Sequence, residues 1–143
     1  MRAPEPPDHH DAELVLRLYE LRREPTMRES RDLLNSKFMP KSFEDLTAVA
    51  AADHPMSRAF RQVSTYWEMA YGLMKHGTLN ADLAMESNGE GFLLFAKVHP
   101  FLTQIRAEMN PRAFVNAEWV ATQTEVGQRV FSMFQARVEK ARN

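Results

Sequence analysis

The side chains that could carry chemistry gather first on one predicted helix, residues 56–76. Tyr66, Glu68, Tyr71 and Lys75 belong to it. Glu68 and Lys75 are about two helical turns apart, with Tyr71 between their levels. Phenol, carboxylate and ammonium groups in such a row could line a polar cleft and bind a small ligand. The alternative is a structural role, since aromatic side chains of a core often have charged neighbours at its rim.

A second polar group surrounds the most apolar segment of the sequence and consists of Asn88, Glu90, Lys97 and His99. Glu90 and Lys97 are seven residues apart and therefore share a helix face. His99 precedes Pro100, which removes one backbone hydrogen bond and leaves a carbonyl oxygen free. The imidazole of His99 could donate to that oxygen, or it could act as a group that titrates near neutral pH. Glu90 and His99 join the four residues of the central helix as candidate ligand-binding residues.

Patterns typical of metal, nucleotide and nucleophile sites are absent from the sequence. It has no cysteine, and its histidines at positions 9, 10, 54, 76 and 99 form neither a Glu-x-x-His pair nor an i, i+4 pair. The glycines at 72, 77, 89, 91 and 127 form no phosphate-binding loop, and no Gly-x-Ser-x-Gly motif occurs. We therefore predict no metal and no cofactor, and the sequence assigns no catalytic residue.

The central helix is defined by its periodicity and by its ends. Pro55 suits a helix start and Gly77 suits the left-handed residue that ends a helix. Between them, apolar residues recur at intervals of three and four: Met56, Phe60, Val63, Trp67, Ala70 and Met74. A second apolar row beside the first indicates a helix that is covered on more than one side.

Similar signals predict helices over residues 11–23, 26–39, 42–52, 80–85 and 90–109, the last interrupted at Pro100. Asn110-Pro111 is typical of a helix start and opens a final helical segment, 111–142. No segment alternates with period two, which excludes a substantial sheet. The sequence therefore predicts an all-α fold, a bundle of six or seven helices around residues 56–76, with a flexible arm at 1–8 and a single domain at 9–143.

The final segment suggests self-association. As one helix, its 32 residues would be about 48 Å long, more than the roughly 35–40 Å diameter of a globule of this chain length. It must therefore protrude, or break at Thr122–Glu125 or at Gly127. In either case it carries an apolar stripe that needs a partner, which could be the protein's own core or a second copy. We expect a homodimer whose interface includes Val130, Phe131, Phe134 and Val138.

The amino-acid composition limits the classes of binding partner that we expect for the protein. The 18 basic and 19 acidic residues leave a formal net charge of −1, so no global field favours nucleic acid or an anionic membrane. The N-terminus has no apolar signal-peptide core, and no run approaches the ~18 apolar residues of a membrane span. We expect a soluble, cytoplasmic protein with no nucleic-acid and no membrane partner.

Two stretches carry a family resemblance. Ser57-Arg-Ala-Phe-Arg-x-Val-x-Thr-Tyr-Trp-Glu-Met-Ala70 and Asn88-Gly-Glu-Gly-Phe-x-x-Phe-Ala-Lys-x-His-Pro-Phe-Leu102 resemble stretches of a group of uncharacterised bacterial helical proteins, a domain of unknown function. The resemblance covers roughly residues 14–110. It implies a bacterial all-helical domain and assigns no catalytic residue.

Three functions remain open. The first is a protein-interaction or scaffold module with an unknown protein partner, because packing alone explains the pattern. The second is a small-molecule binding or sensing domain, and the third is an enzyme of unknown reaction. A pocket of several hundred Å3 with convergent polar groups would favour ligand binding, whereas an exposed apolar helix face would favour interaction.

Overall fold

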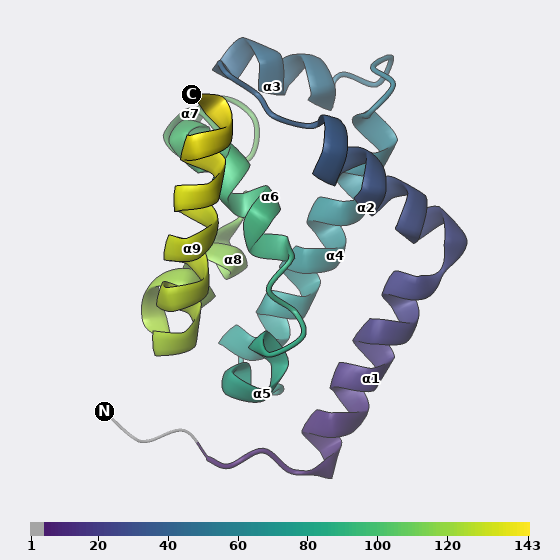
Figure 1. Cartoon of the computed structure of the whole chain (residues 1–143), viewed down its shortest axis with the longest axis vertical. Helices are drawn as coiled ribbons and strands as arrows, with labels where there is room; N and C mark the ends of the chain where they lie inside the picture. The colour runs from purple at the N-terminus through teal and green to yellow at the C-terminus, as the bar shows by residue number, and fades with distance from the viewer. Residues whose placement is uncertain (1–4) are drawn as a thin grey trace.

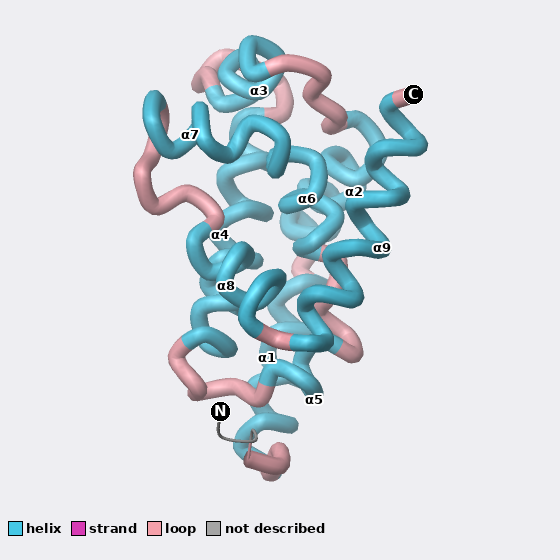
Figure 2. Tube along the Cα trace, turned by 90° about the vertical axis from the view of Figure 1, so that its left-hand side faces the viewer, coloured by secondary structure: helices cyan, strands magenta, loops and turns pink. Residues whose placement is uncertain are grey.

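The computed structural model describes residues 5–143, and within them every regular element is a helix (Figures 1 and 2). In chain order these are α1 (His9–Arg23), α2 (Pro25–Lys37), α3 (Phe43–Ala50), α4 (Ser57–Lys75), α5 (Ala81–Met85), α6 (Gly91–Val98), the 3-10 turn η1 (His99–Phe101), α7 (Leu102–Glu108), α8 (Val115–Gln123) and α9 (Glu125–Arg142). The predicted all-α class is confirmed. In the same range no helix combines the length and apolarity that crossing a membrane requires.

Several helix ends follow the sequence signals. Asp8 and Asp11 form a capping box at the start of α1, in which each carboxylate accepts the backbone N–H of the other residue. Ser42 and Asn80 accept backbone N–H groups at the starts of α3 and α5. Gly77 ends the turn after α4 at φ +75°, a conformation that favours glycine. Of the predicted arm, residues 1–4 lie outside the described residues, and residues 5–8 lead into α1 without regular structure.

The predicted helix start at Asn110-Pro111 is wrong. Asn110 Oδ1 accepts the backbone N–H of Arg112 at 2.9 Å, so the cap residue closes a turn of its own. Phe114 then adopts φ 58°, in the left-handed region, and α8 begins only at Val115. The N-terminus of α8 is capped from a distance by α4: Glu68 accepts the N–H groups of Asn116 at 2.8 Å and Ala117 at 2.9 Å.

Two breaks divide the long apolar segments into shorter helices. Pro100 interrupts the first, where η1 separates α6 from α7. Thr124 interrupts the second, since its hydroxyl accepts the N–H of Gly127 at 2.9 Å and caps α9. A Cβ at Gly127 would collide with the carbonyl oxygen of Val120, so only glycine lets α9 turn back against α8. The break at Thr122–Glu125, one of the predicted alternatives, therefore resolves the length mismatch.

The core surrounds α4, which lies between α2 and α8, and α6, which lies against α9. Phe131 of α9 packs its ring against Phe92 and Phe95 of α6, with centroids 6.0 and 5.0 Å apart. Phe131, Phe134 and Val138 are buried, and Val130 packs against the same core. The stripe predicted as a dimer interface is therefore covered within the chain, and it gives no support for a dimer through α9. The homodimer itself stays a prediction.

Candidate functional site

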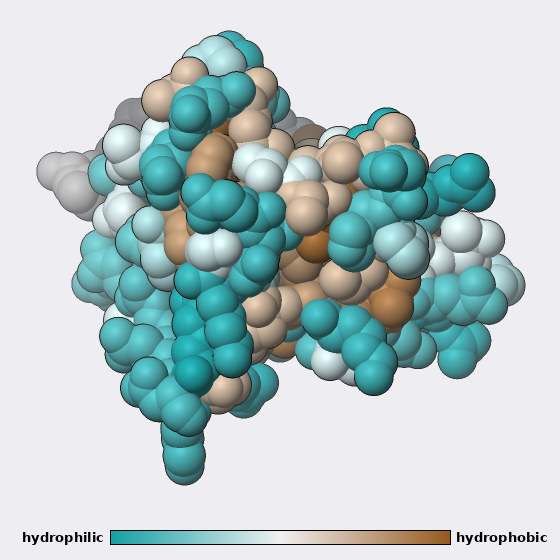
Figure 3. Space-filling model, turned by 90° about the horizontal axis from the view of Figure 1, so that it is seen from above, coloured by the Kyte–Doolittle hydropathy of each residue, from teal (hydrophilic) through white to brown (hydrophobic). Residues whose placement is uncertain are grey.

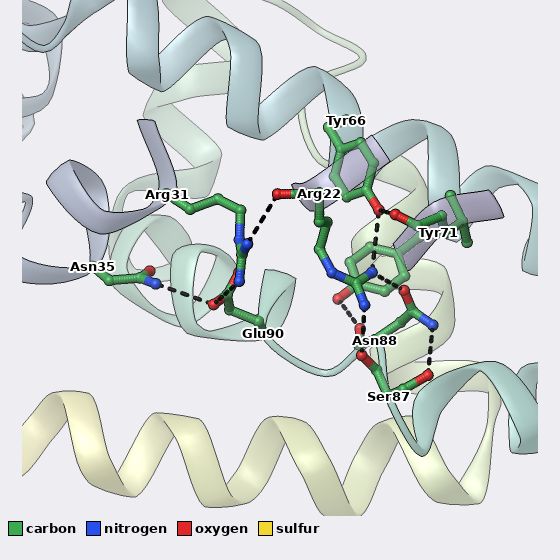
Figure 4. A network of polar contacts seen from close by, with 9 residues as sticks. Arg22, Arg31, Asn35, Tyr66, Tyr71, Ser87, Asn88 and Glu90 are labelled. Carbon is green, nitrogen blue, oxygen red and sulfur yellow. Dashed lines mark hydrogen bonds and ion pairs between the residues drawn. The ribbon is translucent and has the colours of Figure 1, made fainter. Parts of the chain in front are cut away.

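A buried polar network joins α1, α4 and the loop before α6 (Figure 4). Arg22 is 6 % exposed, and its Nη1 donates to the hydroxyl of Tyr66 at 3.1 Å and to Oδ1 of Asn88. Its Nη2 donates to the carbonyl oxygen of Ser87 at 3.3 Å. Tyr66 in turn donates to the carbonyl oxygen of Leu18 at 2.7 Å. The guanidinium also lies over the ring of a neighbouring tryptophan, 5.3 Å from its centroid.

Asn88 is the centre of this network and is fully buried. Its Nδ2 donates to the carbonyl oxygen of Ala84 at 2.8 Å. Its backbone carbonyl oxygen accepts a hydrogen bond from the hydroxyl of Tyr71 at 2.8 Å. Burial raises the pKa of Tyr71 well above its ordinary value and also raises the pKa of Tyr66, the latter opposed by Arg22. Both phenols are therefore neutral hydrogen-bond donors at neutral pH, and their hydroxyls are engaged within the protein.

Glu90 belongs to an ion pair beside the network. Arg31 donates from Nε and Nη2 to the two oxygens of Glu90 at 2.7 and 2.9 Å, a bidentate arrangement. Asn35 donates to the same carboxylate at 3.2 Å. The hydrogen bonds that Arg31 donates to Glu90 raise the pKa of Arg31. Because the carboxylate already has three donors, its main role in this structure is to join α2 to the start of α6.

The six predicted ligand-binding residues do not form one site. The structure brings Tyr66, Tyr71 and Glu90 together around the network, whereas Glu68 faces α8 and serves as its cap. Lys75 is half-buried in the last turn of α4. A row along one helix cannot line one cleft when its members face different neighbouring helices, which periodicity alone does not reveal.

His99 differs from the prediction as well. Its backbone N–H, rather than its imidazole, donates to the carbonyl oxygen of Phe95. The ring instead packs edge-on against Phe95 and Phe131, with centroids 5.5 and 5.2 Å apart. The proposed imidazole donor is therefore replaced by an aromatic contact.

Sequence reasoning missed Arg22 and Arg31. Both carry a signal that could have been used: Arg22 follows Leu18 by four residues and Arg31 follows Met27 by four, so each continues an apolar row toward the core. A charged residue at a core-facing position needs a buried partner. The partner itself, 66 residues away for Arg22 and Asn88, cannot be read from local spacing.

A cleft of about 950 Å3 lies at the end of the molecule that holds α5. Its walls are the residues before and at the start of α1, the end of α4, the start of α5 and the junction of α8 with α9. Its acidic lining residues are Glu5, Asp8, Asp11, Asp82 and Glu125, and no lysine or arginine of the described chain lines it. Trp119 supplies apolar surface, and Met74 and Leu79 also line the cleft but are almost fully buried. We call this feature the acidic cleft.

Hydrogen bonds between side chains and the backbone hold the walls of the acidic cleft together. Asp11 accepts the N–H of Asn80 at 2.9 Å, and Asn80 donates from its side chain to the carbonyl oxygen of Glu5 at 2.8 Å. Hydrogen bonds from the backbone of Asp8 and Asn80 lower the pKa of Asp11. Asp11 is therefore ionised at neutral pH, and it fixes the position of its neighbours.

The carboxylates of the acidic cleft are spread around it. Within residues 5–143 no three His, Asp or Glu side chains converge closely enough to hold a metal ion. Dispersed negative charges suit a partner with separated positive charges better than one compact cation.

These features define an all-α domain with a polar cleft at one end. The chain belongs to the family described as domain of unknown function DUF4760, whose model matches residues 7–124. That membership confirms the resemblance to a domain of unknown function, while the bacterial origin stays a prediction. No curated protein and no solved structure matches the chain. The matched segment ends where α9 begins, although α9 supplies part of the core.

Proposed function

We propose that the protein is a binding domain whose acidic cleft takes an organic cation, a molecule that presents ammonium or guanidinium groups. The observation that carries the proposal is the lining itself: five carboxylates without a lysine or arginine among the described residues. A volume of about 950 Å3 lies within the range of roughly 300–1,000 Å3 typical of ligand pockets. This choice follows the second of the three functions that the sequence leaves open.

The charge of the acidic cleft contrasts with that of the whole chain. The formal net charge is only −1, so collecting five acids on one concave surface leaves the rest of the molecule with a net positive charge. A cleft lined by one sign of charge focuses its field and raises the local concentration of an oppositely charged ligand. His10 also lines the cleft.

Trp119 gives the acidic cleft a second means of recognising a cation. The indole is half-buried and lines the cleft, whereas Met74 and Leu79 line it but are almost fully buried. An aromatic face attracts ammonium and guanidinium groups, and apolar surface accommodates the methylene chains that separate such groups. Polyamines and basic peptides share this chemistry.

Isothermal titration calorimetry with spermidine and with a tetra-lysine peptide tests the proposal and separates the two sources. We expect one of them to bind at low salt and to weaken at least tenfold in the double variant Asp82→Asn, Glu125→Gln. Binding should also weaken as salt screens the carboxylates. Sodium chloride titrated alone gives the background heat.

The matched control changes two exposed acids of α2 that do not line the cleft, Glu29→Gln with Asp32→Asn. This variant should bind as the wild type does. Asp82 and Glu125 lie in the first turns of α5 and α9, so melting curves of both variants check that the fold is retained. No binding of either probe, or equal weakening by the control, would refute the proposal.

A specific observation favours a second function, self-association through α1. Leu16 and Tyr19 are 62 % and 49 % exposed on this helix at the edge of the molecule (Figure 1). Glu13 lies near the start of α1 and Arg23 at its end, so an antiparallel two-fold pairing would place Glu13 of each copy near Arg23 of the other. We propose this face as the homodimer interface in place of α9.

Light scattering after size exclusion tests the dimer. We expect the mass of two chains at micromolar concentration, and one chain for Leu16→Glu with Tyr19→Glu. Met133→Glu, at a methionine that is 50 % exposed on α9, is the control and should leave the mass unchanged. A monomeric wild type, or a double variant that stays dimeric, would contradict this interface.

A further inference from the structure

The end of the molecule opposite α5 contains two cations that bond only to carbonyl groups. Lys97 is 3 % exposed, and its Nζ donates to the carbonyl oxygens of Leu34 at 3.0 Å and Asn35 at 3.4 Å. Arg142, in the last turn of α9, donates from Nη2 to the carbonyl oxygens of Pro40 and Lys97. These bonds join the ends of α2, α6 and α9.

Among the described residues, neither cation of this cluster, Lys97 or Arg142, has a carboxylate within ion-pair distance. The Nε atom of Arg142 is buried and has no hydrogen-bond partner there. An unsatisfied buried donor on a charged group is costly, so this guanidinium is short of hydrogen-bond acceptors. Burial and the nearby charge of Arg142 lower the pKa of Lys97 to about 8, which is consistent with excess positive charge.

A pocket of about 180 Å3 adjoins Arg142. Val138 and residues of α6 and η1 provide apolar walls, while His99, Gln135, Glu139 and Arg142 provide polar groups. At roughly 30 Å3 per water molecule, the space corresponds to about six waters. It is therefore suited to a small metabolite and too small for a nucleotide. Seen from this end, polar side chains cover most of the surface and apolar ones are visible in the depression between them (Figure 3).

We propose that this pocket binds a free amino acid, with the carboxylate toward Arg142 and the amino group toward Glu139. The two side chains line the same pocket without forming an ion pair with each other. A simple anion would be attracted by Arg142 but repelled by Glu139. A simple amine would be attracted by Glu139 but repelled by Arg142. A zwitterion of this size satisfies both charges. The site is distinct from the acidic cleft, which lies at the other end of α9.

Titration calorimetry with the twenty amino acids, and with acetate, phosphate and methylamine as single-charge probes, tests the proposal. We expect at least one amino acid to bind ten times more tightly than each single-charge probe. Gln135→Glu, which places a carboxylate in the pocket, should weaken that binding at least tenfold. The side chain of Gln135 has no hydrogen-bond partner among residues 5–143, so this variant should fold and melt as the wild type does.

Two controls keep the result specific. Gln104→Glu makes the same chemical change at an exposed residue of α7 that does not line the pocket, and it should leave the affinity unchanged. The variant Asp82→Asn, Glu125→Gln should also bind the amino acid normally, which separates this site from the acidic cleft. Binding of no amino acid, tighter binding of phosphate or acetate, or equal loss in Gln104→Glu would overturn the proposal.

Discussion

The carboxylate of Asp11 accepts the backbone N–H of Asn80 at 2.9 Å, which joins the first turn of α1 to the cap of α5. The two residues are 69 positions apart, and between them they close one side of the acidic cleft. The same carboxylate accepts the N–H of Asp8. One side chain therefore caps a helix and fixes the shape of the candidate site.

This relationship predicts an acid-dependent contribution to stability. The folded-state pKa of Asp11 lies below its ordinary value of 3.8, so the ionised carboxylate stabilises the fold above that pH. The contribution is lost as pH falls through the lowered pKa. We expect Asp11→Asn to melt below the wild type at pH 7, and the gap to be smaller at about pH 3, below the ordinary pKa of 3.8. An equal gap at both pH values would show that the charge of Asp11 is not responsible.

The two tryptophans give a matched test of the core. Trp67 is 3 % exposed and stacks on Tyr71 at 5.7 Å, whereas Trp119 is half-buried in the cleft wall. Trp67→Ala should lower the free energy of unfolding by roughly 3–5 kcal/mol, the range for large-to-small changes in a core. Trp119→Ala should lower it by less than half as much. Urea unfolding measures both, and a near-normal Trp67→Ala would count against the architecture.

Because Glu68 caps α8, its substitution should lower the stability of the protein by a modest amount. It caps α8 through two backbone N–H groups at the positive end of the helix dipole. Glu68→Gln keeps one acceptor but loses the charge, so it should cost about 1 kcal/mol of stability. Glu108→Gln, at an exposed residue ending α7, should cost almost nothing. If Glu68→Gln leaves the stability unchanged and instead weakens ligand binding, Glu68 serves as the ligand-binding residue that the sequence predicts and not as a stabilising cap.

The lowered pKa of Lys97 predicts that the protein becomes more stable as the pH rises into the mildly basic range. Its pKa is about 8 in the folded protein and 10.5 ordinarily. Between these pH values the unfolded chain binds a proton that the folded chain lacks, so the unfolding free energy increases with pH. The increase is on the order of 3 kcal/mol at 1.36 kcal/mol per pKa unit. Lys97→Met should lack it, and Lys140→Met, at an exposed lysine of α9, should retain it. Parallel pH profiles for wild type and Lys97→Met would contradict the depressed pKa.

Local signals predict most of the fold and little of the candidate sites. Pro25, Ser42, Gly77 and Asn80 mark helix ends correctly because each acts on backbone groups within a few residues. Asn110 misleads because the same side chain can cap a helix or close a turn, and distant Glu68 decides which. The acidic cleft combines four separate parts of the chain, so its carboxylates show no motif. Periodicity identifies core-facing positions but does not identify the helix that covers them.

A proton–nitrogen correlation spectrum of the protein during a titration with spermidine, and separately with the tetra-lysine peptide, tests whether the acidic cleft binds an organic cation. The chain has two tryptophans, so the indole region contains two signals, assigned with Trp119→Ala. Trp119 lines the cleft, whereas Trp67 is buried against α6. We predict that the Trp119 indole signal shifts and reaches saturation with at least one of the two ligands, while the Trp67 signal stays in place. An unmoved Trp119 signal at saturating concentrations of both ligands would contradict binding in this cleft.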